Sequence, residues 1–210
     1  MSTSSRESES RFAFTVMELL VVIAILSLLV AILIPAVVSS RNAAAKARTR
    51  TQFAQWASAI ESFRSEYGFY PSWDPANKVN SGVTAADHPF HDVLAGRKRD
   101  GSALTSGSLA ASQNKKNISF QPFRADDFGS EGSAGLLCDG FGDTEIAVLC
   151  DRNLDGVINA AEYGDSLPAV HGITPALADF PAEGVRAGVV FYAAAPNATV
   201  DDPRLIMNWK

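Results

Sequence analysis

Residues 14–38 read FTVMELLVVIAILSLLVAILIPAVV and form the most apolar stretch of the chain. From Leu19 to Val38, only Ser27 and Pro35 interrupt the hydrophobic side chains, and no residue is charged. A helix rises by about 1.5 Å per residue, so this stretch would be about 30 Å long, the thickness of a bilayer's hydrocarbon core. The sequence therefore predicts a membrane-spanning helix over residues 14–38.

One acidic residue, Glu18, lies near the start of this stretch, four positions after Phe14. A carboxylate in lipid is unfavourable, and it indicates a functional role with a cationic or hydrogen-bonding partner. The preceding segment, MSTSSRESESRFA, is short and mostly polar. A secretory signal peptide and a plain signal anchor are alternatives for the whole segment.

The order of these features resembles the amino terminus of type IV pilins and of the pseudopilins of type II secretion systems. With Phe14 taken as the first mature residue, Glu18 is the fifth and Pro35 the twenty-second, as in that family. The resemblance implies that a prepilin peptidase removes residues 1–13 and that the new amino group of Phe14 is methylated. The chain departs from the family at Ala13, where glycine is usual.

The resemblance also implies a structural subunit of a filament, stored in the bacterial inner membrane as a single-pass protein with its globular domain on the periplasmic side. Basic residues flank the apolar stretch on both sides, so this orientation rests on the resemblance. The implied partners are other copies of the chain, other pilin-like subunits, the inner-membrane assembly platform and membrane lipid. A surface pilin for adhesion or motility is an alternative within the same class.

Two residues of the apolar stretch have expected roles in assembly. A buried carboxylate needs a cation or hydrogen-bond donors. We therefore expect Glu18 to pair with the free amino group of Phe14 on a neighbouring subunit. Pro35 lacks an amide hydrogen and is expected to kink or loosen the helix.

The helix is predicted to continue as an amphipathic segment over residues 39–67, which contain no glycine or proline. Apolar side chains recur there at helical spacing and form one stripe: Phe53, Trp56, Ala57, Ile60 and Phe63. Gly68 and Pro71 are expected to end the helix. Residues 68–210 are then predicted to form a β-rich globular domain, with a long exposed loop at about 96–117.

Three stretches of this domain are rich in β-prone residues, namely 146–149, 188–195 and 204–209. They predict a small antiparallel sheet of three or four strands. A sheet of this size cannot bury itself, so the apolar stripe on residues 53–63 is its expected cover. The predicted fold class is α+β, with a long N-terminal helix packed against a small antiparallel sheet. Pilins share this architecture.

Residues 151–162, DRNLDGVINAAE, follow the pattern of an EF-hand calcium loop. Oxygen donors stand at positions one, three, five, seven, nine and twelve, the seventh through its backbone carbonyl: Asp151, Asn153, Asp155, Val157, Asn159 and Glu162. Gly156 stands where the loop must turn sharply. The pattern predicts a structural Ca²⁺ site, which major pseudopilins also carry in their C-terminal region. An acidic turn is the alternative, because Asp and Asn are common in turns.

Cys138 and Cys150 flank eleven residues just before this loop. Outside the cytoplasm they are expected to form a disulfide, whereas in the cytoplasm two free buried thiols are expected. His88 and His91 stand close together but lack a further set of metal ligands.

The chain carries no recognisable catalytic motif, so we expect no enzymatic activity. Its net charge of −5 argues against nucleic-acid binding. A membrane-anchored calcium-binding module that does not polymerise is the alternative from another functional class.

Overall fold

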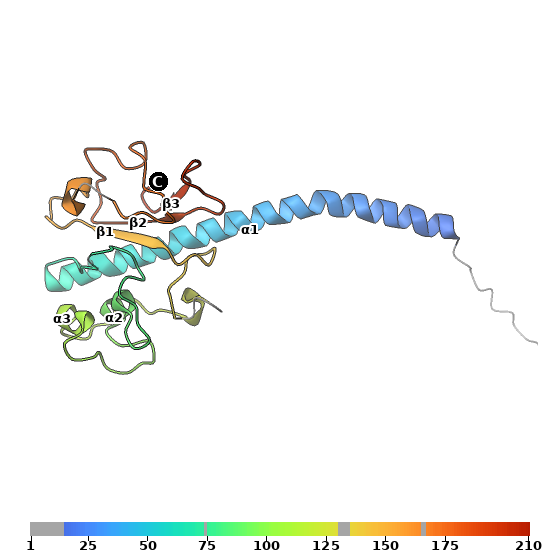
Figure 1. Ribbon diagram of the computed structural model, residues 1–210. Helices are drawn as coiled ribbons and strands as arrows, with labels where there is room; N and C mark the ends of the chain where they lie inside the picture. Colours follow the sequence, from blue (N-terminus) through green and yellow to red (C-terminus); the bar gives the residue numbers. More distant parts are fainter. Residues whose placement is uncertain (1–14, 74, 130–134, 165–166) are drawn as a thin grey trace, which may run out of the picture. The chain divides into compact units, whose positions relative to one another are not determined.

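The computed structural model describes residues 15–73, 75–129, 135–164 and 167–210 (Figure 1). The chain divides into two compact units, residues 1–43 and 44–210. The predicted leader, with Ala13 and Phe14 at its cleavage site, lies outside the described residues. The described helices and strands are α1 (Val16–Tyr67), α2 (Pro89–Ala95), α3 (Leu109–Gln113), β1 (Ile146–Cys150), β2 (Val189–Ala194) and β3 (Leu205–Met207), with short 3-10 helices at η1 (Ala125–Asp127) and η2 (Ala160–Tyr163).

The first unit consists, among the described residues, of the first part of α1. The helix continues through Pro35 without a break. Ser27 donates a hydrogen bond from its hydroxyl to the Ile23 carbonyl at 2.7 Å, so this polar side chain is satisfied within the helix. None of the most apolar window of α1 is buried, and by length and composition it can cross a membrane.

The second unit contains the rest of α1, whose buried side chains face its core. They lie on one helical stripe: Thr49, Gln52, Phe53, Trp56, Ala59, Ile60 and Phe63. The predicted apolar stripe is confirmed, except that Ala57 is half-buried and Ala59 takes its place. Gly68 follows the helix with φ = 79°, a conformation that favours glycine, and its N–H donates to the Arg64 carbonyl at 2.7 Å.

The predicted antiparallel sheet is also confirmed, with three strands in the order β1-β2-β3. Val148 pairs with Phe191 across β1 and β2, and Tyr192 pairs with Met207 across β2 and β3. The fold is therefore α+β, with a long apolar N-terminal helix and a small antiparallel sheet.

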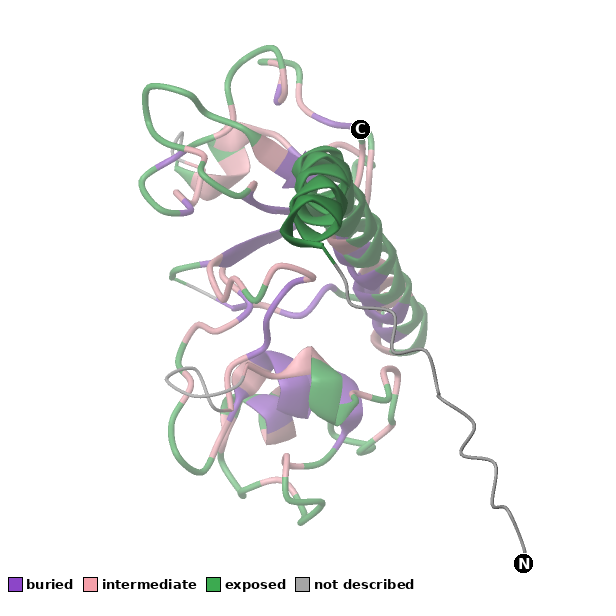
Figure 2. Cartoon of the chain, turned by 90° about the vertical axis from the view of Figure 1, so that its right-hand side faces the viewer, coloured by how far each residue is buried: buried purple, intermediate pink, exposed green. Residues whose placement is uncertain are grey.

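Every residue of β1 and β2 is buried. Because alternate residues of a strand point to opposite sides, both faces of the sheet are covered. One face joins α1 and α2 in a cluster that includes Trp56, Phe90 and Phe191. The other face packs against loops of the C-terminal half in a second core cluster, which includes Ile158, Phe180 and Tyr192. Figure 2 shows buried residues on the strands and on the C-terminal part of α1. The sequence predicts that α1 covers one face of the sheet, but it does not predict the loops that cover the other face.

The long loop expected over residues 96–117 is largely exposed, but its second half contains the short helix α3. Asn114 follows α3 and is fully buried. Its amide nitrogen donates to the carbonyls of Val93 and Ile118, at 2.8 and 2.7 Å. Its side-chain oxygen accepts a hydrogen bond from the Tyr67 hydroxyl at 2.7 Å. One asparagine thus ties this segment to α1 and α2.

Candidate functional site

The N-terminus of α1 is built around Glu18. The Glu18 carboxylate accepts hydrogen bonds from the backbone N–H and the hydroxyl of Thr15, both at 2.9 Å. The Thr15 hydroxyl in turn accepts the backbone N–H of Glu18 at 3.2 Å. This reciprocal pair is a capping box, which satisfies donors that the first helical turn leaves open. The spacing Thr-x-x-Glu is its sequence signature, so this cap is predictable from the sequence.

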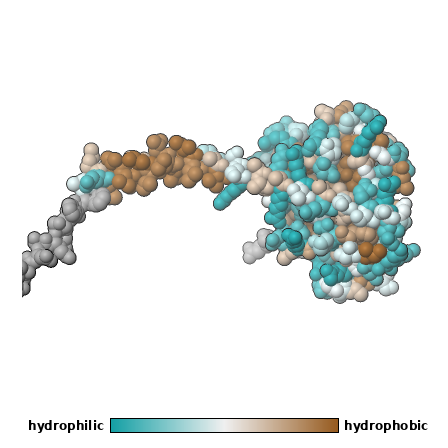
Figure 3. Space-filling view, turned by 180° about the vertical axis from the view of Figure 1, so that it is seen from behind, coloured by the Kyte–Doolittle hydropathy of each residue, from teal (hydrophilic) through white to brown (hydrophobic). Residues whose placement is uncertain are grey.

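Beyond this cap, the first unit presents an apolar surface on every side of the helix. Large aliphatic side chains over residues 16–38 are exposed, for example Val16 at 82% and Ile32 at 67% (Figure 3). A surface of this kind requires a covering of lipid or of other apolar helices. The unit therefore combines an all-round apolar helix with a single carboxylate in its first turn.

The predicted calcium loop forms a compact turn directly after β1. Asp151 is buried, and its two carboxylate oxygens accept the N–H groups of Asp155 and Gly156 at 3.3 and 2.7 Å. The side-chain oxygen of Asn153 also accepts the Asp155 N–H, and Asp155 accepts that of Val157. Gly156 has φ = 85°, as the sharp turn at this position requires.

The second half of the loop is closed by another capping box. The Asn159 side chain accepts the N–H of Glu162 at 3.2 Å, and the Glu162 carboxylate accepts the N–H of Asn159 at 3.0 Å. The other Glu162 oxygen accepts the backbone N–H of Arg152 at 2.9 Å. Ile158 forms an antiparallel bridge with Val185 and fills the second core cluster. Both ends of the loop are thus held by the fold.

The donor chemistry of this loop suits Ca²⁺, because all six expected ligands are oxygens. The buried Asp151 carboxylate is met by backbone N–H groups, and no cationic side chain of the described residues forms an ion pair with it. Over the same described ranges, no three His, Cys, Asp or Glu side chains are grouped so as to hold a metal ion. The site therefore rests on its donor set and turn geometry.

The expected disulfide between Cys138 and Cys150 is not formed, since both thiols are free and buried. The Cys138 carbonyl accepts a hydrogen bond from Gln52 of α1, whereas burial and the nearby Glu61 carboxylate raise the pKa of Cys150. A disulfide requires Cα atoms within about 7 Å. Sequence separation alone does not reveal this distance.

We expect two thiols to react per chain when the full-length protein, purified without reductant, is unfolded in urea and treated with a thiol reagent. Almost no reaction is expected before unfolding, because both thiols are buried and their pKa values are raised by burial. The same assay after reduction is the control. A titre near zero in the unreduced sample would contradict the structure.

The geometry thus shows a long apolar N-terminal helix with a capped carboxylate, and an α+β unit with an acidic loop anchored at both ends. Neither feature by itself names a protein class. Comparison of the chain with family models, curated proteins and solved structures finds no match.

Proposed function

We propose that this protein is the structural subunit of a filament of the type IV pilus class, and more closely a pseudopilin of a type II secretion system. The supporting observation is the first part of α1, which is apolar on all sides and buries none of that surface within the chain. Lipid covers it while the subunit is stored in the inner membrane, and the same helices of other copies cover it in the filament. The role is structural rather than enzymatic.

Glu18 favours a polymerising subunit over a plain anchor. An anchor needs only apolar surface, and a carboxylate in its first turn destabilises it in lipid. The Thr15 cap neutralises none of the negative charge of Glu18, since both of its donors are neutral. The cation that a buried carboxylate requires is the amino group of a processed Phe14 on the neighbouring subunit.

The loop at residues 151–162 is proposed to hold Ca²⁺ in the periplasm, through Asp151, Asn153, Asp155, Asn159 and Glu162 and the carbonyl of Val157. Bound calcium supplies positive charge that offsets the repulsion between these carboxylates. The chain's own part is to hold the loop between β1 and the second core cluster, through Tyr163. The Tyr163 hydroxyl bonds the backbone N–H and carbonyl of Cys150, at 2.7 and 2.6 Å.

Mass spectrometry of the chain purified from membranes tests the proposed class. We expect the mature protein to begin at a methylated Phe14, because the peptidase acts before the phenylalanine. The variant Ala13→Gly is the matched control, and it should be processed at least as completely. An intact Met1 terminus in both proteins would contradict the proposal and favour an anchored module that does not polymerise.

Calorimetry of the full-length protein in detergent, titrated with CaCl₂, tests the metal site. We expect a binding heat and a higher unfolding temperature in calcium, because the ligand stabilises the folded state that binds it. The double variant Asp151→Ala, Glu162→Ala should lose both effects. The matched control, Asp201→Ala with Asp202→Ala, removes two exposed carboxylates elsewhere and should keep them. Equal heats from all three proteins would exclude the site.

A further inference from the structure

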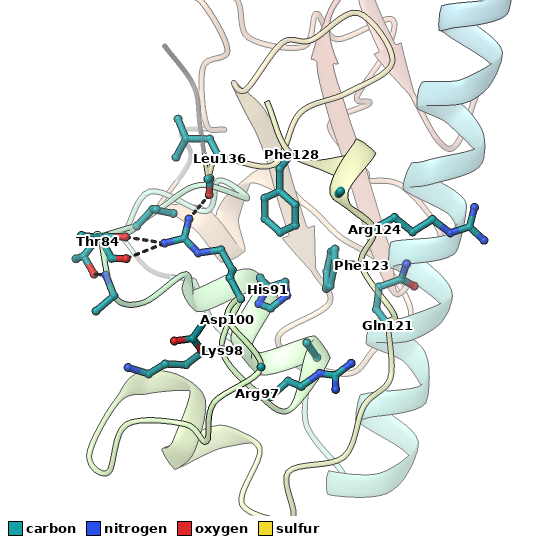
Figure 4. A pocket seen from close by; sticks show the side chains of 18 residues that line it. Thr84, His91, Arg97, Lys98, Asp100, Gln121, Phe123, Arg124, Phe128 and Leu136 are labelled. Atoms are coloured by element: carbon teal, nitrogen blue, oxygen red, sulfur yellow. Dashed lines mark hydrogen bonds between the residues drawn. The ribbon is translucent and has the colours of Figure 1, made fainter. Parts of the chain in front are cut away.

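A cavity of about 1290 Å³ opens in the second unit, between α2 and the segment that leads into η1 (Figure 4). Its wall includes three aromatic rings, those of His91, Phe123 and Phe128. The His91 ring centroid lies 4.8 Å from that of Phe123 and 5.7 Å from that of Phe128. Both phenylalanines are half-buried, so part of each ring faces the cavity. None of these residues belongs to α1 or to the loop at residues 151–162.

The histidine in this wall is held by a buried carboxylate. The Asp92 carboxylate accepts a hydrogen bond from His91 Nδ1 at 2.8 Å and from the backbone N–H of His88 at 2.9 Å. Asp92 is 2% exposed and His91 6%. Because a carboxylate only accepts, Nδ1 carries the hydrogen, and Nε2 of the neutral ring is an acceptor. Among the described residues no hydrogen bond is made by Nε2, so a residue that lines the cavity keeps an acceptor nitrogen for a ligand.

The neighbouring His88 has a different role. It is fully buried, and its Nε2 pairs with the Asn80 side chain at 3.0 Å while its Nδ1 accepts the His91 backbone N–H. Burial lowers the pKa of His88 to about 3, so it stays neutral. Both of its ring nitrogens are used within the fold. Of this pair, only His91 offers a ring nitrogen to the cavity.

The rim of the cavity is positively charged. The cavity is lined by one carboxylate, that of Asp100, and by four cationic side chains: Arg97, Lys98, Arg99 and Arg124. Lys98 is paired with Asp87 at 3.2 Å. Arg97 and Arg124 are exposed, and neither guanidinium has a partner within the described ranges; Figure 4 shows both extending to the same side. Free guanidinium groups of this kind bind carboxylates through paired hydrogen bonds.

The backbone around the rim disfavours a peptide ligand. Arg99 donates hydrogen bonds to the carbonyls of Thr84, Ala85 and Gly135. These carbonyls would otherwise accept the N–H groups of a docked peptide. What remains is an aromatic wall, one acceptor nitrogen and two free cations. These match a ligand with a flat apolar face, a hydroxyl donor and a carboxylate.

We propose that this cavity binds a carboxylate-bearing sugar, such as a uronic acid unit of a polysaccharide. The sugar ring packs on Phe123 and Phe128, a hydroxyl donates to Nε2 of His91, and the carboxylate pairs with a guanidinium of the rim, that of Arg97 or of Arg124. Asp92 is a positioning residue that fixes the tautomer of His91. The inference does not depend on filament assembly.

The test is NMR of the full-length protein with ¹⁵N-labelled histidine, in dodecylphosphocholine micelles, whose head group contains no sugar. The three histidines provide an internal comparison. Trigalacturonate at millimolar concentration is expected to shift the Nε2 signal of His91. The signals of His88, which is bonded within the fold, and of His171, which pairs with Asp143, should stay in place.

The variant Arg97→Gln, Arg124→Gln changes two exposed side chains and leaves the aromatic wall intact. It should bind trigalacturonate about tenfold more weakly, because charge-assisted hydrogen bonds are lost. Maltotriose, a neutral trisaccharide, should produce little shift in either protein. An equal response to maltotriose, to acetate or to triglutamate would overturn the proposal, pointing respectively to a neutral sugar, a simple anion site or an acidic peptide site. No shift of His91 with trigalacturonate would overturn it as well.

Discussion

Replacing Glu18 with alanine is expected to abolish filament formation while the chain still enters the membrane. In the proposed filament, the substitution leaves the amino group of Phe14 on each neighbouring subunit without its counter-charge. Breaking a buried ion pair from one side costs about 3–5 kcal/mol. That cost raises the subunit concentration needed for assembly by a factor of more than about 100. The measurement is the amount of filament sheared from cells that carry the assembly machinery, relative to the amount of membrane-bound subunit.

The capping box supplies the control for this experiment. Glu18→Gln keeps an acceptor for the Thr15 N–H, so the first turn of α1 stays capped. Only the charge is removed. If glutamine supports assembly as well as glutamate, Glu18 acts through the cap alone and the pairing with Phe14 is wrong. If both variants fail, the charge is the property that matters.

Trp56→Ala is expected to destabilise the second unit by about 3–5 kcal/mol. The indole is fully buried where α1 meets the sheet, with ring centroids of Phe90 and Phe191 at 5.3 and 5.8 Å. Removing it leaves a cavity between elements that come from opposite ends of the unit's sequence. Relaxation there is limited, because the Phe90 ring also packs at a tilt against Trp73, with ring centroids 4.9 Å apart.

The two buried thiols report this loss directly. Urea unfolding of the full-length protein in detergent can be followed by the labelling of Cys138 and Cys150, since the reagent reaches them only after the unit opens. Gln55→Ala is the control one position earlier, on the exposed side of the same helix. It should change the free energy of unfolding by less than about 0.5 kcal/mol. A change of similar size for Trp56→Ala would mean that the aromatic cluster contributes little.

The elements that the sequence predicts well are those with a local signal. The helix ends at Tyr67 as Gly68 indicates, and the three β-prone stretches form one sheet. The stripe on α1 follows from helical periodicity alone. By contrast, α3 is five residues long and is anchored by Asn114. The partners of Asn114 lie on α1, α2 and its own loop, so no local pattern reports their contacts.

The candidate sites divide in the same way. The loop at 151–162 has a pattern whose spacing dictates its own turns, and the structure contains those turns. The disulfide depended on a distance across the fold, and that prediction is wrong. The sequence also does not predict the hydrogen-bonded pair of His91 and Asp92. A histidine next to an aspartate is common in any sequence, and only burial and an unused ring nitrogen set this one apart.

The boundary between the two units lies inside α1, at residues 43 and 44, and not at the end of the helix. A recombinant fragment that begins at residue 68, where the sequence suggests the globular domain starts, therefore lacks one wall of its own core. It loses Phe53, Trp56, Ile60 and Phe63, and it exposes the face of the sheet that they cover. A fragment that begins at residue 44 keeps all four side chains and discards the apolar stretch. The choice of starting residue thus decides whether a fragment without the apolar stretch folds or aggregates.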